Sequence, residues 1–587
     1  MTAIVLLSAV LNLYRLSHEG LGNLYYAAAV KSMLMSWHNF FFVAADPLGA
    51  VSVDKPPLGL WIQALDAKVF GFSGLNLIIP EALAGTFSVV LIFVLVARSS
   101  GQWSGLLAAL FLALTPVSVA TNRNNTMDSL LVFILLMATW SLFQALSSNT
   151  ISWLLVTGVL FGLGFNVKYA EGLIVVPAFV ITYLLSAPHS YRRQMRDLAA
   201  AFGAFLFTSL LWLVPVSLTP ASQRPWIGST QNNSIWDLVW DYTSLGRIIP
   251  HASRTQPLSL GGPDALRLFH DSFGGQVSWL LPLALFSAIA MSIVGRWRRP
   301  LSSHQQAVIL WGGWFVVGLT LFSTMGFLQP YYLVVLAPPI AALAAMGAAA
   351  MVRWETKSRF WPILPVSITG TAVVQLAQLQ DYPAWESRLG PYIIIVTLTG
   401  LIIAISARWI KTRRSAVTMA GVSLGLIGIL IAPAVWSLLP VLHGGNPWVP
   451  QGGPIVQTNN GTPATLIQSE QLLVATLRPT RGNERFLLGT IGSPVASQIF
   501  LSTGEPVMTL GGFSGNEPIP PPTQLIHSVR YLVVNQIQLT QPYALFSPAS
   551  WDTELVRWLS SNGGWVRQHC PRQVVAASFS VYGPCTP

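Results

Sequence analysis

Long runs of apolar residues recur along this chain and constrain its fold more than any other feature. A helix needs about 20 apolar residues to cross the hydrocarbon core of a bilayer. Thirteen runs approach or reach that length, at 2–16, 77–97, 103–120, 129–146, 151–166, 171–187, 198–218, 277–295, 306–325, 331–351, 360–379, 391–407 and 416–440. The sequence therefore predicts an α-helical polytopic membrane protein with about thirteen transmembrane helices.

Composition supports this prediction. Of the 587 residues, 52% are hydrophobic and only 9% are charged, whereas soluble domains carry about 25% charged residues. The first run, 2–16, is short, and no small-residue cleavage site follows it. We expect it to be a short span, or a span whose first residues precede Met1, rather than a signal peptide.

The positive charge of the chain gives the orientation. A net charge of +11 could indicate nucleic-acid binding, but the basic residues lie in short clusters between apolar runs, as the positive-inside rule requires. The clusters are Arg192, Arg193 and Arg196; Arg296, Arg298 and Arg299; Arg353, Lys357 and Arg359; and Arg408, Lys411, Arg413 and Arg414. All four fall on one side, which should be the cytoplasm. The N-terminus then starts inside, and an odd number of spans places the C-terminal region outside.

Three long segments and three short turns fall on the outer side. The long ones are 17–76, 219–276 and 441–587, and the turns are 121–128, 166–171 and 326–332. Within the first, the aromatic stretch 25–42 is either a helix in the membrane interface or an ordinary buried helix.

The C-terminal region differs from the rest of the chain. We expect a membrane domain at 1–440, a Gly/Pro/Asn-rich linker at 441–485 and a soluble α/β domain at 486–587. Strands are predicted at 486–491, 506–510, 531–535 and 574–582, and helices at 493–502, 522–529 and 552–562. The only two cysteines, Cys570 and Cys585, lie in this domain. They form a disulfide if the domain is extracytoplasmic, or are two free thiols.

Ionisable residues at the outer ends of spans need an explanation, because burying charge in a membrane is costly. Taken singly, each of these residues has a structural explanation. Thr126 or Asn125 could cap the helix that Asp128 begins, and Lys168 could pair with Glu171 at a helix end. Together they lie on one face of the membrane, so they could line one cavity.

Several motifs resemble a known family. The stretch DKPPLGLW at 54–61 is similar to the first-outer-loop element of glycosyltransferase family 39, which includes the protein O-mannosyltransferases and the lipid A aminoarabinose transferase. The bacterial YkcB-type mannosyltransferase-like proteins are more similar still. They carry stretches like 23–30, 36–42, 53–57 and 122–129, and a soluble C-terminal domain with a turn like 511–513.

The resemblance implies a GT-C fold whose site takes a sugar from a polyprenyl phosphate. An outer carboxylate would act as general base, for which Asp54 and Asp128 are the candidates. Cations must offset charge on the phosphate leaving group, and the candidates are Lys55, Arg123 and Lys168. The expected substrate-binding residues are Asn23, Tyr26, Asn125, Tyr331 and Tyr332. No metal site or cofactor is predicted, although Asp46, Asp54 and Asp128 could hold a divalent cation.

The chain departs from the family pattern at two places. Gly22-Asn23 stands where many members have Asp-Glu, and Gln329 stands where His is expected before Pro-Tyr-Tyr. The first departure leaves open whether Asp54, Asp46 or Asp128 is the base. The second removes any role of a histidine at that position.

The expected function is an inverting hexosyl transfer, mannose-like or with a pentose variant, to a cell-envelope glycan, lipid or protein at the outer face of a bacterial plasma membrane. Two alternatives stay open. A transporter or flippase for lipid-linked glycans would need mid-membrane charges and repeated helices. A non-catalytic scaffold would fit the loss of Asp-Glu at Gly22-Asn23.

Overall fold

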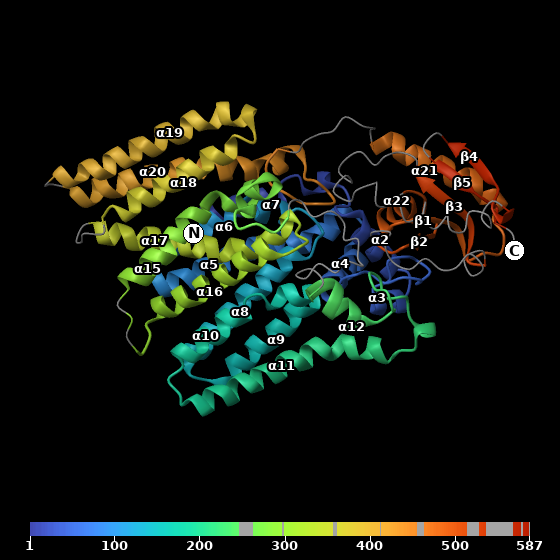
Figure 1. The fold of residues 1–587 in the computed structure, drawn as a ribbon, viewed down its shortest axis with the longest axis horizontal. Helices are drawn as coiled ribbons and strands as arrows, with labels where there is room; N and C mark the ends of the chain where they lie inside the picture. The colour runs from blue at the N-terminus through green and yellow to red at the C-terminus, as the bar shows by residue number, and fades with distance from the viewer. Residues whose placement is uncertain are drawn as a thin grey trace.

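The computed structural model describes residues 1–245, 262–295, 297, 299–355, 361–410, 413–454, 463–513, 527–535, 568–576 and 579–585. They form an elongated molecule with a helical bundle at one end and a small sheet domain at the other (Figure 1). The helices that follow the first span, between residues 24 and 70, lie between these two parts.

Each of the thirteen predicted runs coincides with a helix of the bundle. These helices are α1 (Thr2–Leu13), α5 (Gly74–Ser100), α6 (Gln102–Ala113) with α7 (Pro116–Asn122), α8 (Asp128–Ser148), α9 (Ile151–Lys168), α10 (Val176–Ser186), α11 (Tyr191–Leu218), α15 (Leu281–Val294), α16 (Ser303–Thr324), α17 (Ala337–Glu355), α18 (Ile363–Leu379), α19 (Pro383–Ser406) and α20 (Arg414–His443). Among the described residues, nine spans are long and apolar enough to cross a membrane. The chain is therefore a multi-pass membrane protein.

The remaining predicted runs form shorter or broken helices. α6 and α7 make a pair bent by 62°. Pro116 at the start of α7 explains the break, because proline disfavours a helical conformation in the preceding residue, Thr115. α1, α10 and α18 have 12, 11 and 17 residues. They are helical but short of a full span.

Small residues let some helices approach closely. α19 and α20 pack along Gly400, Gly421 and Gly425, and a Cβ added at Gly421 would lie 2.3 Å from the backbone nitrogen of Ala404. Glycine stripes of this kind drive helix packing in membranes, where burying apolar surface between helices gains little.

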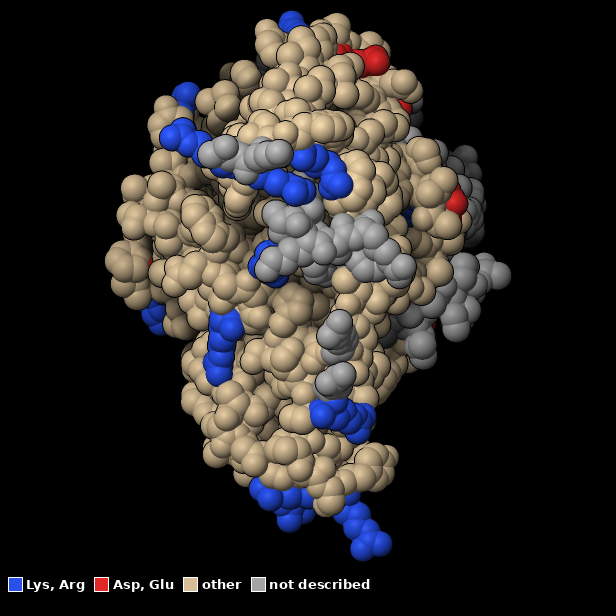
Figure 2. All heavy atoms as spheres, turned by 90° about the vertical axis from the view of Figure 1, so that its left-hand side faces the viewer, with Lys and Arg blue, Asp and Glu red and all other residues tan. Residues whose placement is uncertain are grey.

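The end of the bundle away from the sheet domain is basic. Lys and Arg side chains gather over this face, whereas Asp and Glu show only near its edge (Figure 2). α11 begins and α19 ends here, next to Arg192, Arg193, Arg196 and Arg408. Asp128 at the start of α8 and Lys168 at the end of α9 lie at the opposite end, because both helices run between the two ends.

The aromatic stretch 25–42 forms two helices with different environments. α2 (Leu24–Met33) is mostly buried, whereas α3 (Trp37–Phe42) leaves Trp37 75% exposed. The buried-helix expectation therefore describes the first half. An interfacial position remains a prediction for the second. α4 (Pro57–Phe70) follows and leads into α5.

The C-terminal domain contains a five-stranded sheet of order β2-β1-β3-β5-β4. β1 (Phe486–Ile491) pairs in parallel with β2 (Val507–Leu510) and β3 (Val529–Asn535), while β5 (Phe579–Tyr582) pairs antiparallel with β3 and β4 (Arg572–Ala576). The predicted strand 574–582 is thus two strands. The helix expected at 493–502 is α22 (Ser493–Thr503). The helix expected at 552–562 lies outside the described residues, as does 522–529 up to residue 526.

The domain begins earlier than residue 486. α21 (Pro463–Leu477) lies inside the predicted linker, yet Leu473, Val474 and Leu477 pack into the core of the sheet domain. Cys570 and Cys585 form a disulfide, so the first of the two alternatives holds.

This domain docks on α2. Lys31 of α2 donates to the carbonyl of Leu501 at 3.5 Å, and its ammonium lies 4.9 Å from the ring centre of Phe500. Phe513 packs on Tyr25, with ring centres 4.8 Å apart. Gly511 and Gly512 precede Phe513 with φ of 69° and 70°, a conformation that favours glycine, so the turn can present the ring.

Candidate functional site

Asp128, a candidate base, is fully buried at the first position of α8. No side chain caps this helix at Met127. Instead Glu81, from α5, accepts a hydrogen bond of 2.9 Å from the backbone nitrogen of Leu130. A carboxylate is favoured at a helix N-terminus, so Glu81 fixes the start of the helix that carries Asp128.

Lys168, at the end of α9, links that helix to the start of α8. Its Nζ lies 2.8 Å from a carboxylate oxygen of Asp128 and 2.8 Å from one of Glu171. The same ammonium faces the rings of Tyr332 and Tyr331, at 4.2 and 5.2 Å from their centres. A buried cation needs such compensation. The predicted Lys168–Glu171 pair is confirmed, and the structure adds Asp128 to it.

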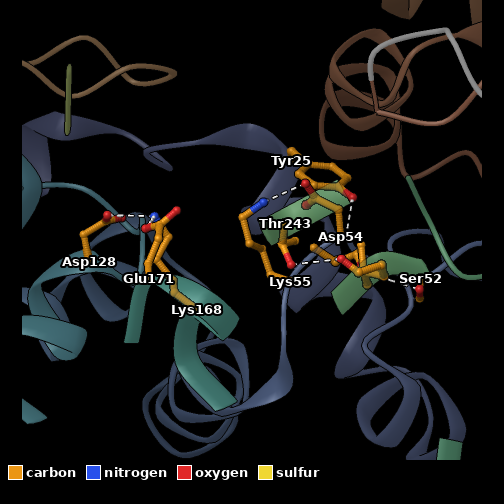
Figure 3. Close-up of polar contacts among 10 residues, drawn as sticks. Tyr25, Ser52, Asp54, Lys55, Asp128, Lys168, Glu171 and Thr243 are labelled. Carbon is orange, nitrogen blue, oxygen red and sulfur yellow. Dashed lines mark hydrogen bonds and ion pairs between the residues drawn. The ribbon is translucent and has the colours of Figure 1, made fainter. Parts of the chain in front are cut away.

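A second ion pair lies beside the first. Lys55 donates to Asp54 at 2.6 Å, and both side chains are buried. The hydroxyl of Tyr25 accepts from the backbone nitrogen of Asp54 at 3.3 Å. Figure 3 shows the two ion pairs in one view, Asp128 with Lys168 and Glu171 on one side and Asp54 with Lys55 on the other. Asp128 is within electrostatic reach of Lys55, so the pairs form one site.

Both candidate bases keep one oxygen without a partner. Asp54 Oδ1 and Asp128 Oδ2 are buried and accept no hydrogen bond within the described part of the chain. A buried carboxylate oxygen left in this state is costly. A ligand that donates hydrogen bonds would satisfy both oxygens.

Tyr26 of α2 lies close to both pairs. Burial raises the pKa of its hydroxyl well above the ordinary value, and the charge of Asp54 raises it further. Tyr332 and Asp128 act on it in the same direction. The Tyr26 hydroxyl therefore keeps its proton and can donate a hydrogen bond. Tyr26, Tyr331 and Tyr332 thus lie near the carboxylates, and substrate binding by these tyrosines remains a prediction.

Asn23 and Asn125 are engaged with each other. The backbone of Asn23 donates to Asn125 Oδ1 at 2.6 Å, and Asn125 Nδ2 donates back to the Asn23 carbonyl at 3.2 Å. Asn23 also caps α2 by accepting from the nitrogens of Tyr25 and Tyr26. Gly22 has φ of 65°, and a Cβ there would lie 2.5 Å from Asn125 Oδ1. Gly22-Asn23 thus has a structural use in place of the acidic pair of other members.

Arg123 does not join the two lysines. Its guanidinium binds Glu19 at 2.5 and 2.8 Å and donates to the carbonyls of Leu11 and Tyr14 at 3.0 and 2.9 Å. Glu19 also accepts from the nitrogen of Gly445 at 2.9 Å. The structure therefore shows Arg123 tying the end of α1 to the first outer segment, with its charge already compensated.

The segment after α20 covers the first outer segment and α7. Asn23 Nδ2 donates to the Trp448 carbonyl at 3.3 Å, and Asn124 Nδ2 donates to that of Pro447 at 3.0 Å. Gln276 exchanges two hydrogen bonds with Gly452, of 2.7 and 3.2 Å. The start of the predicted linker is thus fixed by side chains of the membrane domain.

Sequence reasoning missed Glu19 and Glu81. Glu81 is a lone carboxylate inside the apolar run 77–97, which by itself marks a position with a special role. Glu19 had no such signal, because its partner Arg123 is 104 residues away. Gln329, which replaces the expected His, is buried, and its side-chain amide has no hydrogen-bond partner among the described residues.

Asp46 is not near a metal-binding cluster. Its carboxylate accepts from the nitrogens of Leu48, Ala50 and Val51 at 3.0, 2.8 and 2.9 Å. Burial raises its pKa, and these hydrogen bonds oppose that shift. Within the described ranges, no three His, Cys, Asp or Glu side chains lie close enough to hold a metal ion.

The sequence matches known proteins over nearly its whole length. Residues 54–213 match the family "Dolichyl-phosphate-mannose-protein mannosyltransferase", and 473–562 match "Putative mannosyltransferase YkcB-like, C-terminal". The chain is 31% identical to the Bacillus subtilis protein named "Putative mannosyltransferase YycA", over 95% of this chain and 93% of that one. It is also 30% identical to the B. subtilis protein named "Putative mannosyltransferase YkcB", over 95% of this chain and 90% of that one.

The chain belongs to the YycA/YkcB family. Its fold resembles that of ArnT from Cupriavidus metallidurans bound to undecaprenyl phosphate, with a TM-score of 0.56 and 16% identity over 100% of this chain and 98% of that one. The fold also resembles that of the oligosaccharyltransferase AglB from Archaeoglobus fulgidus, with a TM-score of 0.51 and 13% identity over 94% of this chain and 71% of that one. The YycA/YkcB-family chain thus has the predicted GT-C fold and is a membrane glycosyltransferase.

Proposed function

We propose that this protein transfers a hexose, mannose or a close relative, from a polyprenyl phosphate to an acceptor of the cell envelope. The observation that carries the proposal is the pairing of two buried lysines with two carboxylates that each keep a free oxygen. The lipids named with similar structures, undecaprenyl phosphate for ArnT and dolichol phosphate for AglB, support the type of donor. A pentose donor is a variant of the same proposal.

Lys55 is the proposed partner of the donor phosphate. Lys168 already forms ion pairs with two carboxylates, Asp128 and Glu171, whereas among the described residues Lys55 forms an ion pair with one, Asp54. An anionic phosphate is therefore better compensated at Lys55. As the bond between the anomeric carbon and the phosphate oxygen breaks, the electron pair stays on that oxygen, and Lys55 stabilises the developing charge.

Asp128 is the proposed general base. In an inverting transfer the acceptor attacks from the face of the sugar opposite to the leaving group. Asp54 forms an ion pair of 2.6 Å with Lys55, the proposed phosphate-binding residue. Asp54 would therefore lie on the same side of the sugar as the leaving phosphate. Asp128 belongs to the other ion pair. Its free oxygen would accept the proton of the attacking hydroxyl while the new bond to the anomeric carbon forms. Asp54 would then orient Lys55.

The site is proposed to face the outside of the plasma membrane. The basic end of the bundle (Figure 2) is opposite to the sheet domain (Figure 1), and basic residues favour the cytoplasmic side. Polyprenyl-phosphate sugars supply activated sugar at the outer face, where an acceptor of the cell envelope would meet the enzyme.

The test uses the purified full-length protein in detergent with radiolabelled polyprenyl-phosphate sugars, and measures sugar transfer or release. Asp128→Asn keeps an oxygen for Lys168 but loses the base, so turnover should fall by about 10²–10⁴-fold. Asp197→Asn is the matched control. Asp197 is also buried, but it pairs with Arg196 at 3.2 Å on α11, far along the chain from this site.

Retained turnover in a folded Asp128→Asn protein would refute the assignment of the base. Equal losses in Asp128→Asn and Asp197→Asn would point to a general effect of removing a buried carboxylate. A wild-type protein that bound polyprenyl phosphate but turned over no donor would favour the flippase or scaffold alternatives.

A further inference from the structure

Tyr169 carries two unfavourable features at one position. It ends α9 with φ of 35° and ψ of −120°, and it is not glycine. Side chains with a Cβ rarely adopt this conformation, which is energetically costly and persists only where the surroundings enforce it. Here the turn is held by close packing, since a Cβ on Gly172 would lie 2.7 Å from the carbonyl carbon of Gly164.

The second feature is the Tyr169 hydroxyl. The residue is 1% exposed, and its hydroxyl has no hydrogen-bond partner among the described residues. Its ring packs edge-on against Phe165, with centres 5.4 Å apart. An unpartnered buried hydroxyl costs folding free energy, because it loses its hydrogen bonds to water. Phenylalanine would fill the same space without this cost, so packing does not explain the hydroxyl.

The position of Tyr169 suggests what the hydroxyl contacts. It directly follows Lys168, and it is within electrostatic reach of the Asp54 carboxylate. Among the residues that the structure describes, Asp54 Oδ1, Asp128 Oδ2 and the Tyr169 hydroxyl are thus buried oxygens without a hydrogen-bond partner.

The chemistry of these oxygens limits the ligand. A carboxylate oxygen only accepts hydrogen bonds, whereas a phenol both donates and accepts. An ionised phosphodiester has no proton to donate, so it cannot satisfy Asp54 or Asp128. A ring with several hydroxyls can satisfy Asp54 and Tyr169, because each hydroxyl donates and accepts, while the attacking hydroxyl of the acceptor satisfies Asp128.

We propose that the Tyr169 hydroxyl binds a hydroxyl of the transferred sugar and helps to select it. This inference rests on the proposed function, because it assumes a sugar-phosphate donor. Tyr169 would form a hydrogen bond with the sugar, while Lys55 binds the phosphate. The cost of the unpartnered hydroxyl is then offset when the donor is bound.

The test compares Tyr169→Phe with wild type, using polyprenyl phosphomannose and analogues that each lack one sugar hydroxyl. Tyr169→Phe should lower kcat/KM for the parent donor by about tenfold, the value of one hydrogen bond. For one deoxy analogue the two proteins should be equal, because the contact is already absent. The midpoint of thermal unfolding without donor should stay the same or rise.

Tyr183→Phe is the matched control. The Tyr183 hydroxyl is also buried but donates to Asp197 at 3.2 Å. This variant should unfold at a lower temperature and keep wild-type kcat/KM. The opposite directions of the two stability changes separate a functional hydroxyl from a structural one.

Wild-type kcat/KM in Tyr169→Phe, or an equal penalty in all deoxy analogues, would overturn the inference. The proposed function can fail separately. If wild type turned over no donor, the thermal shift produced by polyprenyl phosphomannose would be compared with that of polyprenyl phosphate. A sugar-dependent shift lost in Tyr169→Phe would keep the contact and reject the transfer, whereas no sugar-dependent shift would reject both.

Discussion

Replacing Arg123 by alanine should destabilise the protein through Glu19. The two side chains are 2% and 5% exposed, so little solvent screens the pair. Removing one partner of a buried ion pair costs about 3–5 kcal/mol, because the other charge stays buried alone. The carbonyls of Leu11 and Tyr14 also lose their donor.

A double-mutant cycle measures this coupling. Arg123→Ala, Glu19→Ala and the double variant are unfolded by titration with SDS in mixed micelles, followed by tryptophan fluorescence. The double variant should lose about 2 kcal/mol less than the sum of the single variants, since the second change removes the stranded charge. Arg478→Ala is the control, because Arg478 pairs with Glu505 but its side chain is 56% exposed. That change should cost at most about 1 kcal/mol.

Additive effects within about 0.5 kcal/mol would refute the reasoning. Wild-type stability in Arg123→Ala together with a loss of donor binding would return Arg123 to the role that the sequence predicted, a contact to the phosphate. Unchanged donor binding in a destabilised variant would separate Arg123 from Lys55 and Lys168.

Two further predictions concern stability. Burial raises the pKa of Glu470 to about 7, above its ordinary value, so folding disfavours the charged form and stability falls as pH rises from about 4.5 to about 7. Glu470→Gln should therefore be more stable than wild type above pH 7, by on the order of 3 kcal/mol, and equal to it below about pH 4.5. Unfolding midpoints across this range test it, and a constant difference would contradict it. Gly421→Leu should separate α19 from α20 and lower the unfolding temperature, whereas leucine at the half-buried position of Gly312, where a Cβ meets nothing within 4 Å, should be tolerated. Equal effects would show that this close approach is unimportant.

The helices could be predicted from the sequence because a bilayer imposes one simple requirement, an apolar run of sufficient length. The requirement is local, so each run could be found separately, including the short one that forms α10. The predicted strand 574–582 failed because two short strands that follow closely in the sequence have the same apolar pattern as one long strand. The start of the sheet domain was misplaced because Gly, Pro and Asn near residue 450 hid the helix that follows.

The site could be predicted only in part. Asp54, Lys55, Asp128 and Lys168 lie at the same end of neighbouring elements, so topology alone brings them together. The partners of Arg123 and Asn125 could not be found this way, because they depend on contacts between segments more than 100 residues apart. Tyr169 shows a third limit. Its sequence context is ordinary, and only its backbone angles and unpartnered hydroxyl distinguish it.

The hydrogen bonds made by residues 445–452 bear on how the protein is synthesised. Glu19, Asn23, Asn124 and Gln276 all precede this segment in the chain, and each of them bonds to its backbone. All of the membrane spans are therefore synthesised before the backbone groups of residues 445–452, to which these side chains bond. A nascent chain that stopped at residue 440 could insert all of its helices and still leave the first outer segment open to solvent. The contacts that cover the first outer segment can thus form only after the chain has been synthesised beyond residue 445.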